Sequence, residues 1–383
     1  MFFLRRIICI FAENYFMRRI YIYQKEGWPK FYWDKEKIAQ ALLNLRYLQG
    51  ELIGKMSVFG FELQNDTHFS TLTNNVLKSS EIEGEYLNTD QVRSSVAKRL
   101  GMDVSGFVNS EKKVEGVVEM SFDATHNADK LLTKKRLFSW HKLLFQEENQ
   151  NSNLSIGSWR GEKGGEMQVV SGAMGKERIH FQAPDYSIID SEMTVFLEWI
   201  NNEKELDNIL KAAIAHLWFV TIHPFDDGNG RIARAIADML LARADNISQR
   251  FYSMSSQILI ERKDYYNILE RTQKRDLDIS DWLEWFLNCL KRAFAQTDNN
   301  INKLIFKSKF WENNKNIVFN ERQTKIINLL FNNFEGKLTT SKWAKINHCS
   351  QDTALRDIND LIEKKILKKD EQGGRSTSYD LCF

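Results

Sequence analysis

A short stretch of the sequence, residues 222–234, contains residue types that could handle a phosphate chain. His223 can accept a proton near neutral pH, and Asp227 offers the hard oxygen ligand that suits Mg²⁺. Gly228 and Gly230 allow the backbone between them to bend tightly and to present bare N–H groups. The stretch therefore combines a candidate base, a candidate metal ligand and a candidate anion-binding turn.

A helix is predicted to begin directly after this turn, because apolar residues recur there at helical spacing. They are Ile232, Ile236, Met239 and Leu240. The first turn of a helix favours an anion through its N–H groups and its dipole. Arg231 and Arg234, three residues apart, lie on one face of that turn. The whole stretch indicates a polyphosphate site with a proton acceptor at its edge.

Each of these residues also has a simpler interpretation when it is taken alone. A Gly-Asn-Gly turn before a helix is common, and His223 could be a buried histidine with satisfied hydrogen bonds. Arg234 could pair with Asp238, four residues later on the same helix face. The complete set, in this order and spacing, favours the phosphate site over these interpretations.

The stretch resembles the core motif of the Fic family, His-Pro-Phe-x-Asp/Glu-Gly-Asn-Gly-Arg-x-x-Arg, and every fixed position matches. The resemblance implies a protein adenylyltransferase, which moves AMP from Mg-ATP to a Ser, Thr or Tyr hydroxyl of a target protein. The related Doc branch carries lysine where Gly230 stands, so the resemblance disfavours kinase-type chemistry.

Carried over by position, the resemblance implies a role for each motif residue. His223 would be the general base, and Asp227 would be the Mg²⁺ ligand. The remaining positions would bind the phosphates of ATP: Gly228, Asn229, Gly230, Arg231 and Arg234. Further along the chain, Tyr265 or Tyr266 would face the adenine, although each could equally be a core or helix-surface tyrosine.

An upstream stretch, Ser79-Ser-Glu-Ile-Glu83-Gly84, places Ser79 and Glu83 on one helix face. Taken alone, Ser80-x-x-Glu83 is typical of a capping box at a helix start. The pattern Ser/Thr-x-x-x-Glu-Gly/Asn also resembles the inhibitory helix of the Fic family, in its N-terminal class. That resemblance implies that Glu83 meets Arg234 through bidentate hydrogen bonds, excludes the γ-phosphate from its productive place, and is assisted by a weaker Ser79 contact.

Residues 166–182 contain short β-rich runs around a glycine turn, which predicts a hairpin. It could be an ordinary surface hairpin. The family resemblance instead implies a flap that binds a segment of the target protein by main-chain pairing beside the active site.

The composition indicates a large, mainly helical chain. It has 383 residues, 43% of them hydrophobic and only three of them proline, which is ample for two or three domains. The net charge of +2 predicts no bulk attraction to nucleic acid or membrane. The four cysteines fit no zinc or redox spacing, and with no convincing export signal they favour a reducing cytoplasm.

The amino-terminal residues are apolar, with Arg5 and Arg6 among them. The run Ile7–Ala12 is too short for a signal-peptide core of about 7–15 residues and far below a membrane span of about 20 residues. We interpret the segment as an over-extended or disordered start, with Met17 as the true first residue. The predicted divisions are 1–19 for this start, 20–107 for a helical N-terminal extension with the inhibitory helix, 108–295 for the catalytic core, 296–319 for a connector and 320–383 for a C-terminal domain.

The C-terminal domain is predicted to be a winged helix, because a helix-turn-helix pattern is followed by a two-stranded hairpin. Ser350 would cap the second helix, and Gln351, Thr353 and Arg356 are the candidates for facing a DNA groove. Three acidic residues of that helix would repel phosphates if they faced them: Asp352, Asp357 and Asp360. Both a DNA partner and a protein partner therefore stay open for this domain.

Together these features predict an all-α Fic-type core with a small β-hairpin, a helical extension and a C-terminal winged helix. The expected activity is a regulated protein adenylyltransferase that uses ATP and Mg²⁺. Two alternatives stay open. One is an enzyme that removes AMP, with Glu83 orienting water, and the other is a DNA-binding regulator that senses nucleotide. The oligomeric state, including a homo-oligomer, is also open.

Overall fold

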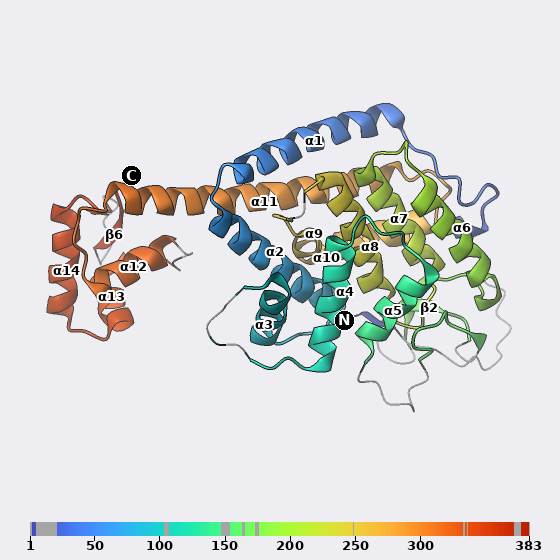
Figure 1. The fold of residues 1–383 in the computed structure, drawn as a ribbon, viewed down its shortest axis with the longest axis horizontal. Helices are drawn as coiled ribbons and strands as arrows, with labels where there is room; N and C mark the ends of the chain where they lie inside the picture. Colours follow the sequence, from blue (N-terminus) through green and yellow to red (C-terminus); the bar gives the residue numbers. More distant parts are fainter. Residues whose placement is uncertain are drawn as a thin grey trace. The chain divides into compact units, whose positions relative to one another are not determined.

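The computed structural model describes residues 2–4, 21–102, 106, 108–146, 154–162, 165–172, 176–247, 249–331, 334, 336–370 and 377–382. They form two compact units, Met1–Thr297 and Asp298–Phe383. Helices dominate each unit and the strands are short, as Figure 1 shows. The chain is therefore mainly helical, as its composition predicts. Among the described residues, no helix is both long and apolar enough to cross a membrane.

Within its described residues, the first unit contains ten complete α-helices, the first part of an eleventh, two short 3-10 helices and three strands. The helices are α1 (Lys35–Ser57), α2 (Phe61–Ile82), α3 (Thr89–Leu100), α4 (Lys112–His126), α5 (Lys134–Leu144), α6 (Ile189–Asn202), α7 (Asn208–Ile222), α8 (Asn229–Asp245), α9 (Met254–Ile260), α10 (Arg262–Gln273) and α11 (Ser280–Asn313). The strands are β1 (Phe2–Leu4), β2 (Gln168–Ser171) and β3 (Arg178–Gln182).

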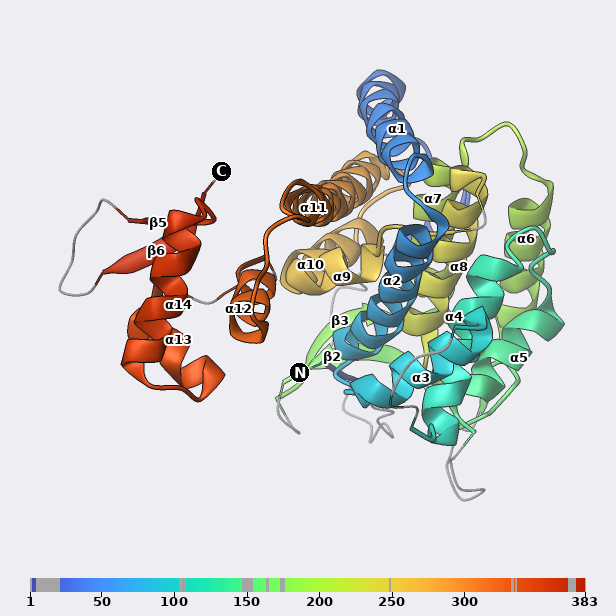
Figure 2. The same cartoon turned by 60° about the vertical axis from the view of Figure 1, so that its left-hand side comes forward.

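Helices α7 and α8 form the centre of this unit and lie side by side in both views (Figures 1 and 2). Every residue of α7 from Ile209 to Ile222 is buried, as expected of a helix that is apolar on all sides. Most of α8 is buried too, from Asn229 to Ala242 with the exception of Gly230. The loop between the two helices is the candidate site, so it is attached at both ends to a deeply buried helix.

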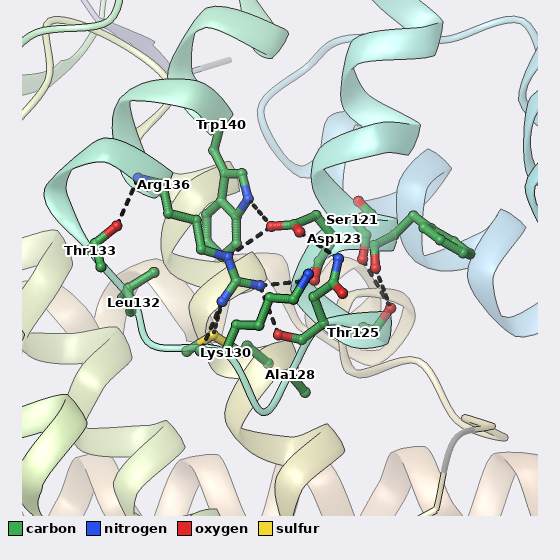
Figure 3. A network of polar contacts seen from close by, with 12 residues as sticks. Ser121, Asp123, Thr125, Ala128, Lys130, Leu132, Thr133, Arg136 and Trp140 are labelled. Atoms are coloured by element: carbon green, nitrogen blue, oxygen red, sulfur yellow. Dashed lines mark hydrogen bonds and ion pairs between the residues drawn. The ribbon is translucent and has the colours of Figure 1, made fainter.

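A polar network fixes α5 against α4 (Figure 3). Asp123 Oδ2 accepts hydrogen bonds from Arg136 Nε at 2.8 Å and from Trp140 Nε1 at 2.7 Å. Arg136 also donates to the carbonyl oxygens of Asp123 and Lys130, at 2.9 and 3.0 Å. Thr133 caps the start of α5 by accepting from the Arg136 backbone N–H. The network matters for the site because α5 carries His141, which contacts the α7–α8 loop.

The N-terminal extension packs on the helical core through aromatic and charged side chains. Trp28 donates from Nε1 to Glu192 Oε2 of α6 at 2.8 Å, and its ring lies 6.1 Å from that of Trp218 of α7. Asp34 caps α1 by accepting from the Lys37 backbone N–H at 3.0 Å. The extension is therefore part of the same compact unit as the core.

The predicted hairpin is present as β2 and β3, which pair antiparallel. Strand β1 pairs antiparallel with the other edge of β2, with Phe3 opposite Val170, so the sheet order is β1-β2-β3. Phe2–Leu4 lie in the segment interpreted as an over-extended or disordered start, and they form a strand there because the edge of β2 offers backbone partners to an extended segment. Met17, the proposed first residue, lies outside the described residues.

The predicted connector at 296–319 is mostly helical. α11 continues to Asn313, because no glycine or proline interrupts the sequence between Ser280 and Asn313. The boundary between the two compact units falls inside this helix, between Thr297 and Asp298.

The second unit contains the predicted succession of helices and strands. After the end of α11 come α12 (Glu321–Phe331), β4 (Leu338–Thr339), α13 (Thr340–Asn347), α14 (Gln351–Glu363), β5 (Leu367–Lys369) and β6 (Ser378–Leu381). The strands form a three-stranded sheet in the order β4-β6-β5, so the predicted two-stranded hairpin gains a third strand. Trp343, Ile358 and Leu361 are fully buried in its core. Ser350 caps α14 by accepting from the Thr353 N–H at 3.1 Å, as predicted.

Candidate active site

His223 ends α7 and lines a cavity at the head of α8. Its backbone is left-handed (φ 53°), which is uncommon for a residue other than glycine. Its Nδ1 lies 3.2 Å from the Val220 carbonyl oxygen, so we assign the ring proton to Nδ1, which donates to that oxygen. Nε2 is buried and has no hydrogen-bond partner among the described residues. Burial lowers the pKa of His223 to about 4, so the ring is neutral at pH 7 and Nε2 can accept a proton.

Asn229 holds the loop that joins His223 to α8. Its Oδ1 accepts from the Phe225 N–H at 3.0 Å, and its Nδ2 donates to the Phe225 carbonyl oxygen at 2.8 Å. Gly228, just before the helix, has φ 80°, a conformation that favours glycine. The side chain of Asn229 is thus committed to closing the loop, and only its backbone remains for the predicted phosphate-binding turn.

Two residues that the sequence motif does not include also hold this loop. Arg160 donates from Nε to the His223 carbonyl oxygen at 2.8 Å. His141 accepts from the Gly157 N–H at Nδ1 and lies 3.2 Å, at Nε2, from the Asp227 carbonyl oxygen. Burial lowers the pKa of His141 to about 4, so the neutral ring donates from Nε2 to the loop. Neither contact has a local sequence signal, because the partners lie far apart in the chain.

Arg231 and Arg234 are buried in the first turn of α8, each about 2% exposed. Glu83 Oε1 lies 2.8 Å from Arg234 Nη1, so the two distant stretches meet as the family resemblance implies. Burial alone would raise the pKa of Glu83, but Arg234, supported by Arg231, lowers it below its usual value. The ionised carboxylate of Glu83 therefore lies beside Arg234, at the place where the family resemblance implies a phosphate group of ATP.

The predicted bidentate contact between Glu83 and Arg234 is wrong. Arg234 donates from Nε to Ser79 Oγ and from Nη2 to the Ser79 carbonyl oxygen, both at 2.9 Å. That edge of the guanidinium is therefore occupied, and Glu83 contacts Arg234 through one oxygen. Its other oxygen, Oε2, accepts from the Tyr266 hydroxyl at 3.3 Å.

Two simpler interpretations are also wrong. Glu83 is the C-terminal cap of α2, so Ser80 and Glu83 end a helix and do not form a capping box at a helix start. Asp238 does not pair with Arg234, because it is bound by Arg250 Nη1 at 2.8 Å and by Asn75 Nδ2 at 2.7 Å.

The two candidate tyrosines differ in their surroundings. Tyr265 is buried, and its hydroxyl lies 2.8 Å from Nε2 of the buried His216. It therefore contributes to the core behind Arg234, as His216 does. Tyr266 is half-buried, and its hydroxyl reaches Glu83. Both residues line the cavity, but Tyr266 is the one in contact with a predicted site residue on α2.

Asp227 is placed to take one position around a Mg²⁺ ion. Its Oδ1 accepts from the Gly228 N–H at 2.6 Å, and its Oδ2 lies 3.9 Å from Arg231 Nη2. Its side chain is 40% exposed, so a hydrated ion can reach it. Among the described residues no group of three His, Cys, Asp or Glu side chains surrounds a common point. One carboxylate fits Mg²⁺, which commonly takes its other ligands from phosphates and water.

One cavity brings these parts together. Its lining includes Glu83 from α2, His223 and Gly230 from the motif, Tyr266 from α10, and Val170 and Phe181 from the hairpin. The hairpin is tied to α10, because His180 Nδ1 and Glu270 Oε2 lie 2.5 Å apart. The candidate base, the start of α8, the Glu83 carboxylate and the predicted flap therefore line a common cavity.

Comparison with known proteins identifies the domain that contains this site. Residues 131–241 match the Fic/DOC family, and residues 21–102 match a domain of unknown function, DUF4172. The chain thus carries a Fic/DOC family domain, as the motif predicts. The second match covers most of the predicted N-terminal extension.

Several curated proteins are similar to parts of the chain. A probable protein adenylyltransferase of Aquifex aeolicus is 31% identical over 78 residues, which are 20% of this chain and 24% of that protein. The protein adenylyltransferase fic-1 of Caenorhabditis elegans is 39% identical over 64 residues, 16% of this chain and 12% of that protein. The chain therefore spans about a quarter or less of the length of these relatives.

Two solved structures are similar in fold. A Fic family protein from Desulfovibrio desulfuricans has a TM-score of 0.49 at 20% identity, over 89% of this chain and 95% of that chain. A Fic domain containing signaling protein from Bacteroides thetaiotaomicron has a TM-score of 0.46 at 19% identity, over 68% of this chain and 95% of that chain.

We predict that the His223 ring stays neutral, with its proton on Nδ1, when the pH is lowered from 7 to 5.5. The reason is burial, which lowers its pKa to about 4. Nitrogen-15 chemical shifts of the ring, assigned by comparison with His223→Asn, measure this. Asparagine is a suitable control because it tolerates the left-handed backbone. A titration midpoint near 6.5, the usual value for histidine, would contradict the geometry described above.

Proposed function

We propose that the protein is an autoinhibited protein adenylyltransferase that transfers AMP from ATP to a hydroxyl of a target protein. The observation that carries the proposal is one cavity lined by both His223 and Gly230. His223 Nε2 is buried without a hydrogen-bond partner among the described residues, and Gly230 lies in the first turn of α8, beside the buried Arg231 and Arg234. The Fic/DOC match and the names of the relatives support the same activity.

The proposed chemistry assigns a step to each group of side chains in the site. His223 Nε2 takes the proton of a target Ser, Thr or Tyr hydroxyl, and the hydroxyl oxygen attacks the α-phosphorus of ATP in line. The bond from the α-phosphorus to the bridging oxygen breaks, and pyrophosphate leaves. Arg231, Arg234 and the N–H groups at the start of α8 bind its charge. Asp227 would hold Mg²⁺, which supplies further charge neutralisation on the phosphates.

The target segment would dock on the hairpin formed by residues 166–182. The edge of β2 already carries Phe2–Leu4 as an antiparallel strand, which supports strand addition as the mode of docking. Val170 and Phe181 of the hairpin line the same cavity as His223. A target segment that takes the place of Phe2–Leu4 along this edge would thus bring its hydroxyl near His223 without a long sequence requirement.

The first test of this proposal is His223→Ala, which removes the only base in the mechanism. Transfer of label from α-³²P-ATP should fall by about 10²–10⁴-fold, while ATP binding should persist because the phosphate contacts remain. His223→Asn, which suits the left-handed backbone, separates loss of the base from distortion of the loop. Transfer within threefold of the native rate in both variants would rule out His223 as the base.

We further propose that Glu83 inhibits transfer by occupying Arg234. The carboxylate lies directly over the head of α8: a Cβ added to Gly230 would come 2.1 Å from Glu83 Oε1. Glu83 therefore uses the space that only a glycine leaves open, beside a helix start that favours anions. A γ-phosphate that approached Arg234 Nη1 would be repelled by this carboxylate, which already occupies the position.

The second test is Glu83→Gly, which should increase automodification and target labelling even if the variant is less stable. Ser79→Ala should act in the same direction but more weakly, because it removes a hydrogen bond worth about 1 kcal/mol. Labelling and unfolding are both measured. A less stable Glu83→Gly with unchanged labelling would mean that Glu83 is only a structural cap.

The same variant tests the alternative of AMP removal. If Glu83 orients water, Glu83→Gly should abolish loss of label from a pre-labelled target while it increases transfer.

A second function, DNA binding by the C-terminal unit, is favoured by the arrangement of α14. Asp357 is buried and bound by Arg322 Nε at 2.7 Å, and Asp360 is bound by Gln323 and Lys364. Two of the three acidic residues thus face other side chains of the unit, which leaves exposed polar residues such as Gln351 and Arg356. Thr353 is less suited than predicted, because its hydroxyl pairs with Ser350 at 2.9 Å.

We expect Arg356→Ala to weaken binding of the protein to duplex DNA and to reduce the salt dependence of that binding by about one ion. Fluorescence anisotropy at low salt measures both quantities. Lys325→Ala is the matched control, because it removes one positive charge from α12, outside α14. Absence of any binding by the native protein at low salt would favour a protein partner for this unit.

A further inference from the structure

A second carboxylate, Glu85, lies on the other arginine of the motif. Glu85 Oε2 is 2.8 Å from Arg231 Nη1, just as Glu83 Oε1 is 2.8 Å from Arg234 Nη1. Arg231 is 2% exposed, and the centre of its guanidinium lies 5.2 Å from that of the Phe145 ring. Packing therefore holds this guanidinium in place, so any group that binds its Nη1 must bind it at this position.

The end of α2 explains how one short segment reaches both arginines. Gly84 has φ 84°, and its N–H donates to the Glu81 carbonyl oxygen at 3.0 Å. The Glu85 N–H donates to the Ser80 carbonyl oxygen at 3.0 Å. This is the Schellman arrangement that ends many helices, and it suits glycine at the left-handed position. The turn fixes Glu83 and Glu85 on either side of Gly84, each over a different arginine.

We propose that Glu85 competes with ATP phosphate oxygens for Arg231, so that the turn Glu83-Gly84-Glu85 blocks both phosphate-binding arginines. This inference rests on the proposed function and specifies its regulation. A phosphate oxygen that accepts from Arg231 Nη1 needs the place that Glu85 Oε2 occupies. Lys113 Nζ of α4, 3.5 Å from Glu85 Oε2, gives the displaced carboxylate a second partner. Removal of Glu83 alone therefore releases only one arginine.

The test is the equilibrium affinity of the full chain for Mg-ATP and for AMP, which lacks the outer phosphates. Glu85→Gln should tighten Mg-ATP binding about tenfold, since release of one charged contact is worth about 1.4 kcal/mol, and should leave AMP binding unchanged. The effect should add to that of Glu83→Gln in the double variant. Glu81→Gln is the matched control: it removes a carboxylate from the same turn of α2, where its partner is Lys78.

Two results would overturn the proposal. Weaker Mg-ATP binding in Glu85→Gln would mean that Glu85 orients Arg231 for the phosphates, and unchanged binding would mean that the pair does not compete with them. The measurement does not depend on catalysis. If Glu85→Gln tightens Mg-ATP binding but no variant labels any protein, the proposed transfer fails while the competition at Arg231 stands. If Glu83→Gly labels protein but Glu85→Gln leaves Mg-ATP binding unchanged, the proposed transfer stands and the competition at Arg231 fails.

Discussion

The site depends on one electrostatic constraint: two guanidinium groups are buried at the positive end of a helix. Arg231 and Arg234 are each about 2% exposed, and the start of α8 adds its own partial positive charge. A buried cation without a partner is costly, by several kcal/mol in typical cases. The fold must therefore always supply an anion at this place. In the free chain that anion is the pair of carboxylates Glu83 and Glu85.

This constraint explains why α2 and α8 are joined at the site although they are distant in sequence. The carboxylates can reach the arginines because three left-handed residues turn the chain sharply. They are Gly84 after α2, His223 at the end of α7 and Gly228 before α8. Gly84 directs the two carboxylates towards the arginines, and His223 and Gly228 form the turn between α7 and the start of α8. Under the proposed function, inhibition and phosphate binding would use the same two arginines, which the carboxylates of Glu83 and Glu85 already contact in the free chain.

Much of this arrangement could be predicted from the sequence because it is local. Residue types at fixed spacing predicted the start of α8 where the structure has it, and they supplied the candidate base, the candidate metal ligand and both arginines. The meeting of Glu83 with Arg234 was predicted by family resemblance. The prediction of a bidentate contact was wrong because Ser79 occupies the Nε and Nη2 edge of the guanidinium. One of these two contacts is made by the backbone carbonyl of Ser79, and such a contact cannot be inferred from the residue type.

The remaining features depend on tertiary packing. His141 and Arg160 support the α7–α8 loop from α5 and from the segment that follows it, and neither belongs to a recognisable pattern. Glu85 could have been found, since a glycine after a helix end predicts a turn that places the next side chain near the helix again. The continuity of α11 through the expected connector could also have been inferred from its lack of glycine and proline.

The most direct test of the central claim is whether a free polyphosphate can replace the two carboxylates. The unfolding temperature of the native chain and of the Glu83→Gln, Glu85→Gln double variant should be measured with and without inorganic tripolyphosphate. A ligand that binds only the folded state raises this temperature. We predict that the double variant unfolds at a lower temperature and is restored by tripolyphosphate, whereas the native chain barely responds. Equal responses in the two proteins would contradict the claim that carboxylates and phosphates share the same two arginines.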